Sequence, residues 1–158
     1  MTARDADGRL RPNVTLAVLA TAALAYSISQ TMVAPALPEI QRDLGVSATQ
    51  VTWVLTVYLL TASIATPIVG RLGDIYGKER MLTFTLAAFG AGLLVSALSH
   101  SIELLVLGRA IQGLGGAVFP LAFGIIRDEF PREKVATAIG LISATFGIGG
   151  GAGLVISG

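Results

Sequence analysis

The 158-residue chain has no cysteine, one histidine and few charged residues. The absence of cysteine excludes a disulfide, a thiolate metal site and a thiol nucleophile. Charged residues make up 13% of the chain, against about 25% in an ordinary soluble domain, so the sequence cannot supply the polar shell that a soluble fold of this size needs. The formal net charge is +1, and no basic stripe with interleaved aromatic residues indicates a nucleic-acid partner.

Long uncharged runs separate the clusters of charge. A hydrocarbon core about 30 Å thick needs roughly 20 apolar residues in a helix. The sequence therefore predicts an all-α membrane protein with a tail of residues 1–13 and five transmembrane helices, at about 14–37, 51–69, 81–98, 102–126 and 135–158. The first run is too long for a signal h-region and is expected to be retained. Pro35 and Pro38 are expected to end the first helix, and Ser47 to cap the second.

Basic residues near the ends of the spans indicate the orientation. Of the eleven, Arg42 alone follows span one, and Arg109 lies inside span four. The other nine fall in the tail, after span two or after span four: Arg4, Arg9, Arg11, Arg71, Lys78, Arg80, Arg127, Arg132 and Lys134. We therefore expect an integral protein of the plasma (inner) membrane with a cytoplasmic N-terminus and a cytoplasmic tail.

The loop after the second span, residues 70–80, reads Gly-Arg-Leu-Gly-Asp-Ile-Tyr-Gly-Lys-Glu-Arg. A plain polar hairpin would need the glycines and the basic residues but no acid between two glycines. The stretch resembles the signature loop of the major facilitator superfamily, G-x-L-a-D-r-x-G-r-r, from which Gly73, Ile75 and Glu79 depart. The resemblance implies a conformational-switch loop whose acid contacts a helix N-terminus of the opposite half, where the helix dipole favours an anion. Its candidate residues are Gly70, Leu72, Asp74, Gly77, Lys78 and Arg80.

Arg109 lies inside the fourth span, where an arginine costs about 2.5 kcal/mol or more on insertion scales. It either faces the bundle interior or snorkels outward, because only about 10 Å of helix separate it from Ile102. Gln112 lies three residues further on and shares its helical face. Residues 105–117 resemble a second motif of the same family, R-x-x-q-G-x-g-a-A. The resemblance implies a role in proton or substrate coupling for Arg109, Gln112 and Gly113.

The fifth span is rich in glycine, which weakens a lone helix but allows two backbones to pack closely. It partly resembles the antiporter motif of the family, although Leu154 and Ser157 depart from that pattern. The candidate helix-packing residues are Gly140, Gly149 and Gly153.

The first span ends in a stretch that resembles a signature of the family's drug antiporters, of which the fourteen-helix type is favoured. Thr31, Ala36, Leu37 and Pro38 match it, whereas Ser29 stands where the membrane aspartate is expected. An intramembrane acid is a natural proton carrier, so the usual coupling site is in question. Four polar residues are candidates for lining a substrate cavity: Gln30, Thr31, Thr56 and Tyr58.

Taken together, the resemblance implies an incomplete N-terminal six-helix half of the major facilitator fold, because halves in this family consist of inverted three-helix repeats. We expect proton-coupled efflux of drugs or other small molecules. The expected partners are the lipid bilayer, a small-molecule substrate, protons and the missing C-terminal helices of the same transporter; no cofactor, metal or nucleic acid is expected. A membrane enzyme is disfavoured, since His100 is the only histidine. The alternative is a truncated, non-transporting membrane fragment or an assembly partner.

Overall fold

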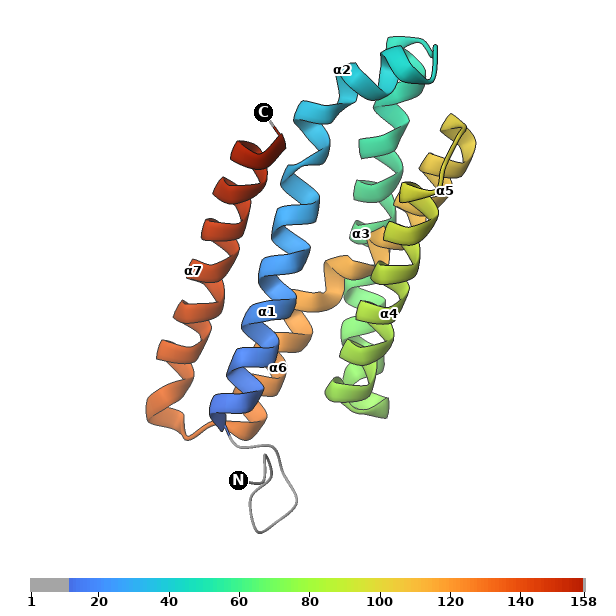
Figure 1. Cartoon of the computed structure of the whole chain (residues 1–158). Helices are drawn as coiled ribbons and strands as arrows, with labels where there is room; N and C mark the ends of the chain where they lie inside the picture. The colour runs from blue at the N-terminus through green and yellow to red at the C-terminus, as the bar shows by residue number, and fades with distance from the viewer. Residues whose placement is uncertain (1–11, 158) are drawn as a thin grey trace.

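A computed structural model describes residues 12–157, and the regular structure in this part of the chain is entirely helical, with no strand (Figure 1). The elements in order are α1 (Pro12–Thr31), α2 (Val33–Asp43), α3 (Ala48–Tyr76), α4 (Lys78–Ala97), α5 (Ile102–Gln112), the short 3₁₀ helix η1 (Gly113–Ala117), α6 (Val118–Glu129) and α7 (Arg132–Ser157).

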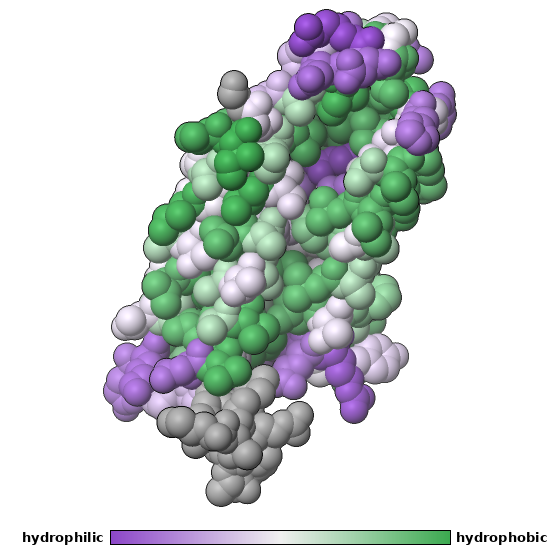
Figure 2. Space-filling view, in the orientation of Figure 1, coloured by the Kyte–Doolittle hydropathy of each residue, from purple (hydrophilic) through white to green (hydrophobic). Residues whose placement is uncertain are grey.

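Five helical segments are long and apolar enough to cross a membrane: α1, α3, α4, the α5–η1–α6 segment and α7. They run alternately up and down (Figure 1). Large apolar side chains such as Leu59, Leu94, Ile148 and Val155 are more than half exposed along their flanks. Figure 2 shows hydrophilic residues gathered at the two ends and a broad, mainly apolar band between them. A surface of this kind suits lipid rather than water, so the predicted integral membrane helix bundle is confirmed.

The end of the first span differs from the expectation. Instead of continuing to residue 37, α1 ends at Thr31, and α2 begins at Val33 and contains both prolines. Pro35 is tolerated because it lies in the first turn of α2, where backbone N–H groups have no partner inside the helix. Residues 39–43, expected in a loop, therefore belong to α2.

The predicted cap of the second span is confirmed. The Ser47 hydroxyl accepts a hydrogen bond from the Gln50 backbone N–H at 3.2 Å, and the Gln50 side chain accepts one from the Ser47 backbone N–H at 3.0 Å. This reciprocal capping box fixes the start of α3.

The expected loop at residues 70–80 is almost entirely helical. Helix α3 continues to Tyr76 and α4 begins at Lys78, so Gly77 alone joins them. The turn is possible because Gly77 adopts a φ of +99°, which glycine reaches without the steric cost that a side chain would add. Asp74 and Lys78 therefore lie on the ends of two consecutive helices.

The fourth span is interrupted where one continuous helix was expected. Gly113, Gly115 and Gly116 lie in the 3₁₀ segment between α5 and α6, where their low helix propensity favours a change of helix type. The main hydrophobic core contains buried side chains from α1, α3, α4, α6 and α7. The Tyr26 ring, for example, lies 5.3 Å from that of Phe89 and 5.7 Å from that of Phe119, measured between ring centroids.

Candidate functional site

Arg109 is buried in the middle of the bundle, with only 2% of its surface exposed. Its Nε donates a hydrogen bond to the Val54 carbonyl oxygen at 3.2 Å, and its Nη1 donates to the side-chain oxygens of Gln30 at 3.2 Å and Gln112 at 2.6 Å. The guanidinium carbon also lies 4.5 Å from the centroid of the Tyr58 ring, within range of a cation–π contact. A side chain held in this way points into the bundle and does not snorkel to the interface.

Gln112 ties this arginine to a further helix. Its side-chain Nε2 donates to the Gly92 carbonyl oxygen at 3.1 Å and to the Ser96 hydroxyl at 2.8 Å, both on α4. A Cβ atom at Gly92 would lie 2.7 Å from Cγ of Gln112, which is closer than real carbon contacts allow. Gly92 is thus needed for the close approach of α4 to α5.

Gly113 has the corresponding role against α3. A Cβ atom there would lie 2.6 Å from Cβ of Thr61 and 2.9 Å from the Tyr58 carbonyl oxygen. The small residue after Gln112 therefore lets the end of α5 approach α3, as small residues do at helix interfaces in membranes. Arg109, Gln112 and Gly113, which the sequence grouped by a motif, all lie in one buried cluster.

Two of the four cavity candidates belong to this cluster. Gln30 and Tyr58 contact Arg109 directly, and the Tyr58 hydroxyl shares a hydrogen bond with the Tyr26 hydroxyl. Sequence reasoning did not single out Tyr26, although it lies four residues before Gln30 and hence on the same face of α1.

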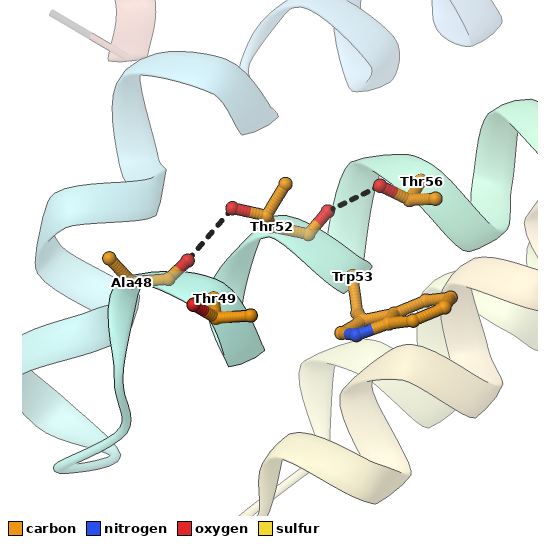
Figure 3. Close-up of a pocket in the computed structure, with 5 residues that line it drawn as sticks. All are labelled: Ala48, Thr49, Thr52, Trp53 and Thr56. Atoms are coloured by element: carbon orange, nitrogen blue, oxygen red, sulfur yellow. Dashed lines mark hydrogen bonds between the residues drawn. The ribbon is translucent and has the colours of Figure 1, made fainter.

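The other two candidates lie elsewhere. The Thr31 hydroxyl donates to the Ser27 carbonyl oxygen of its own helix at 3.0 Å. Thr56 is exposed on α3, because two residues along a helix turn it about 200° away from Tyr58, and its hydroxyl donates to the Thr52 carbonyl oxygen at 3.1 Å. Figure 3 shows Thr56 in an open pocket of about 390 Å³ lined by Ala48, Thr49, Thr52, Trp53 and Thr56, where the threonine hydroxyls at 52 and 56 bond backbone oxygens.

Among residues 12–157, no acid joins the cluster around Arg109. The described Asp and Glu residues lie in α2 or within a few residues of a span end: Glu39, Asp43, Asp74, Glu79, Glu103, Asp128, Glu129 and Glu133. Ser29, at the position of the expected aspartate, donates to the Ala25 carbonyl oxygen of its own helix at 2.9 Å. Between residues 12 and 157, no three His, Cys, Asp or Glu residues are placed to hold a metal ion.

The loop motif forms a second cluster at the end of the bundle where α3 meets α4. Lys78 Nζ lies 3.1 Å from Asp74 Oδ1 and 2.7 Å from Asp128 Oδ2, so it bridges the end of α3 to the end of α6. These three residues line a cavity of about 350 Å³ together with Gly70 and Arg127. Asp128 follows the predicted fourth span closely and lies in the last turn of α6, and the sequence gives no sign of its pairing with Lys78.

The other loop candidates have separate surroundings. Leu72 is partly buried, Arg80 is exposed on the first turn of α4, and Gly77 makes the turn. Within the motif, Gly77 thus makes the turn, whereas Asp74 and Lys78 belong to the charged cluster.

The glycines of α7 divide between two faces. A Cβ atom at Gly149 would lie 2.9 Å from Cβ of Ser27, and one at Gly153 would lie 2.7 Å from the Ile28 carbonyl oxygen. Both therefore allow α7 to lie directly against α1, as Figure 1 shows. Gly140 does not share this role in the described structure, because an added Cβ would meet nothing within 4 Å. It lies about two and a half turns before Gly149 and so on the opposite face.

Nearly the whole chain is similar to known membrane transporters. The family model described as Major Facilitator Superfamily matches residues 19–158. Over 151 residues the chain is 36% identical to the tetracenomycin C resistance and export protein of Streptomyces glaucescens, a match that covers 95% of this chain and 28% of that protein.

Two further relatives are also named for resistance or transport. Over 126 residues the chain is 38% identical to multidrug resistance protein 3 of Bacillus subtilis, covering 79% of this chain and 24% of the relative. Over 144 residues it is 31% identical to the probable actinorhodin transporter of Streptomyces coelicolor, covering 90% of this chain and 25% of the relative. The chain thus spans about a quarter of the length of the curated relatives it matches.

Proposed function

This chain belongs to the Major Facilitator Superfamily, as an N-terminal portion, and we propose that it supplies the first helices of a secondary transporter that exports small molecules in exchange for protons. The relatives' names, which include resistance and export, support the direction of transport. The observation that carries the proposal is the buried Arg109 cluster, whose hydrogen bonds join α1, α3 and α5 and, through Gln112, α4.

The cluster has the properties that a coupling site needs. A charge inside a membrane bundle is costly unless its hydrogen bonds are satisfied, so the packing of four helices depends on what surrounds Arg109. A charged substrate that reached the cluster would change these contacts. In the proposed mechanism, that change shifts the N-terminal half of the transporter between two packing arrangements, as alternating access requires.

The charged cluster at Lys78 is the proposed latch. Lys78 holds Asp74 and Asp128 together, and the Asp74 side chain remains 67% exposed. An exposed carboxylate at the end of α3 has room to bind the positive end of a helix in the remaining part of the transporter. We propose that this contact stabilises one conformation and opens in the other.

The proposed orientation places this latch in the cytoplasm. Apart from Arg109 inside the bundle, the basic residues between 12 and 157 divide six to one between the two ends, with Arg42 alone on one side and Arg71, Lys78, Arg80, Arg127, Arg132 and Lys134 on the other. Such a bias favours the cytoplasmic side for the basic end. On this basis we propose a plasma (inner) membrane location with the start of α1 facing the cytoplasm.

Proteoliposomes test the proposed function. A full-length transporter carrying residues 1–158 as its first part would be reconstituted with a pH gradient and given tetracenomycin C or actinorhodin, the compounds in the relatives' names. We expect the compound to accumulate against its gradient and the pH gradient to fall as it does. Accumulation that continues after the pH gradient is collapsed would contradict proton coupling, and a pH gradient that does not respond to either compound would contradict the exchange.

Residues 1–158 reconstituted alone are the matched control. They supply only one wall of the cavity that lies between the two halves in this fold, and we expect no gradient-dependent movement above that of empty liposomes. Movement at the level of the full-length transporter would show that this part transports by itself and would contradict the proposed two-body mechanism.

A further inference from the structure

The charge of Arg109 has no counter-ion among the described residues, and we propose that the transported molecule supplies one. The substrate would then be an organic anion whose carboxylate, or a comparable anionic oxygen, binds the Arg109 guanidinium. This inference rests on the proposed transport function and names its substrate class.

The charge balance around Arg109 is the first argument. Its hydrogen-bond acceptors are the Val54 carbonyl and the amide oxygens of Gln30 and Gln112, all of them neutral. Buried charges in proteins are normally paired with an opposite charge. Glu103 is the nearest acid along α5, but it lies about 9 Å along the axis and about 240° around the helix, and it is exposed.

The unused donors are the second argument. A guanidinium has five N–H donors, and the hydrogen bonds of Arg109 come from Nε and Nη1. Its Nη2 donates to no residue between 12 and 157. A side chain that is 2% exposed and holds two open donors beside a full positive charge suits an oxygen anion, because charge-assisted hydrogen bonds to carboxylates are stronger than those between neutral groups.

The surroundings fit an anion with an aromatic body. The Tyr58 ring lies against the guanidinium, and its hydroxyl shares a hydrogen bond with Tyr26. The Tyr26 ring in turn lies close to the rings of Phe89 and Phe119. Gln30 is partly exposed, so its side chain is the cover that an incoming molecule would displace. In the face that Figure 2 presents, a hydrophilic recess interrupts the apolar surface between α1 and α5.

A cationic substrate fits the same cluster poorly. It would approach a buried like charge, and the Arg109 contacts among the described residues include no carboxylate to balance it. The site therefore predicts that charge, more than shape, determines which of two otherwise similar molecules binds more tightly.

A matched pair of probes tests this preference without requiring transport. The probes are 1-naphthoate and 1-naphthylmethylammonium, which share a ring and differ in charge. Their binding to purified residues 1–158 would be measured by equilibrium dialysis in nanodiscs of zwitterionic phosphatidylcholine, with empty nanodiscs subtracted. The variants are Arg109→Gln, Arg109→Lys and, as a control at an exposed position, Arg132→Gln; circular dichroism reports whether each keeps its helices.

We expect the anion to bind at least about tenfold more tightly than the cation, as charge-assisted hydrogen bonds of ordinary strength provide. The preference should disappear in Arg109→Gln, survive in Arg132→Gln and survive in reduced form in Arg109→Lys. Equal or tighter binding of the cation to the unmodified chain would overturn the inference, whatever the variants do. So would an unchanged preference in a folded Arg109→Gln variant.

The same measurement on a full-length transporter separates two sources of the anion. If a carboxylate from the remaining helices neutralises Arg109, the preference seen in residues 1–158 disappears there, and the substrate class is refuted. If the substrate supplies the anion, the preference persists. The binding measurement needs no pH gradient. If the full-length transporter failed the proteoliposome test but still bound the anion more tightly than the cation, the proposed function would be contradicted and this inference would not.

Discussion

Replacing Gln112 with leucine tests how much the buried cluster contributes to the fold. Leucine has a similar size, but the change removes the two hydrogen bonds to Gly92 and Ser96 and the closest acceptor of Arg109, at 2.6 Å. Side-chain hydrogen bonds between membrane helices average about 0.6 kcal/mol, and one that involves a charged group contributes about 1.5–3 kcal/mol. The sum predicts that Gln112→Leu lowers the free energy of unfolding by about 3–4 kcal/mol.

The assay is unfolding of residues 1–158 in mixed micelles with increasing dodecyl sulfate, followed by circular dichroism. Gln41→Leu is the matched control, because Gln41 lies on α2 and its side chain makes no hydrogen bond to a described residue; we expect a change within about 0.5 kcal/mol. If Gln112→Leu lost less than about 1 kcal/mol, the cluster would not hold the helices together in the way the hydrogen bonds indicate, and the argument from its geometry to coupling would fail.

Three further predictions follow from other parts of the structure. Gly153→Leu should lower the free energy of unfolding by about 1–3 kcal/mol by overpacking the α1–α7 contact, whereas Gly140→Leu should be nearly neutral because nothing lies near it; equal losses in dodecyl sulfate titrations would refute the assignment of the two faces. Lys78→Ala should reduce export by the full-length transporter and should lower the free energy of unfolding by less than about 1 kcal/mol, since exposed ion pairs contribute little to stability. Unimpaired export would contradict the proposed latch. In intact cells an impermeant thiol reagent should label His100→Cys but not Asp128→Cys, and the reverse pattern would invert the orientation.

The number of spans could be predicted from the sequence because it depends on local composition alone. Five predominantly apolar runs predicted five membrane-length segments, which the structure contains, and Ser47 with Gln50 forms the expected cap. The ends of the helices were less predictable. Tyr76 remains helical because Gly77 alone turns the chain after it. Pro35 lies inside α2, a helix that the sequence did not predict, because the first turn of a helix accepts a proline.

The shared face of Arg109 and Gln112 could also be predicted, since helical spacing sets it. Which residues of other helices meet that face could not. Thr56 and Tyr58 are both polar and nearly adjacent, yet only Tyr58 lies at Arg109, and this depends on how α3 is rotated in the bundle. Lys78 and Asp128 are fifty residues apart in the sequence, so only the packed structure brings the two side chains together.

The most direct test of the central claim replaces Arg109 in a full-length transporter carrying residues 1–158. Export driven by a pH gradient would be measured in proteoliposomes for Arg109→Ala and Arg109→Lys, with membrane abundance determined for each. We expect Arg109→Ala to abolish export at near-normal abundance. We expect Arg109→Lys to be impaired as well, because an ammonium lacks the planar fork that bonds Val54, Gln30 and Gln112 together. Full export by both variants would show that the buried arginine has no part in coupling and would contradict the account.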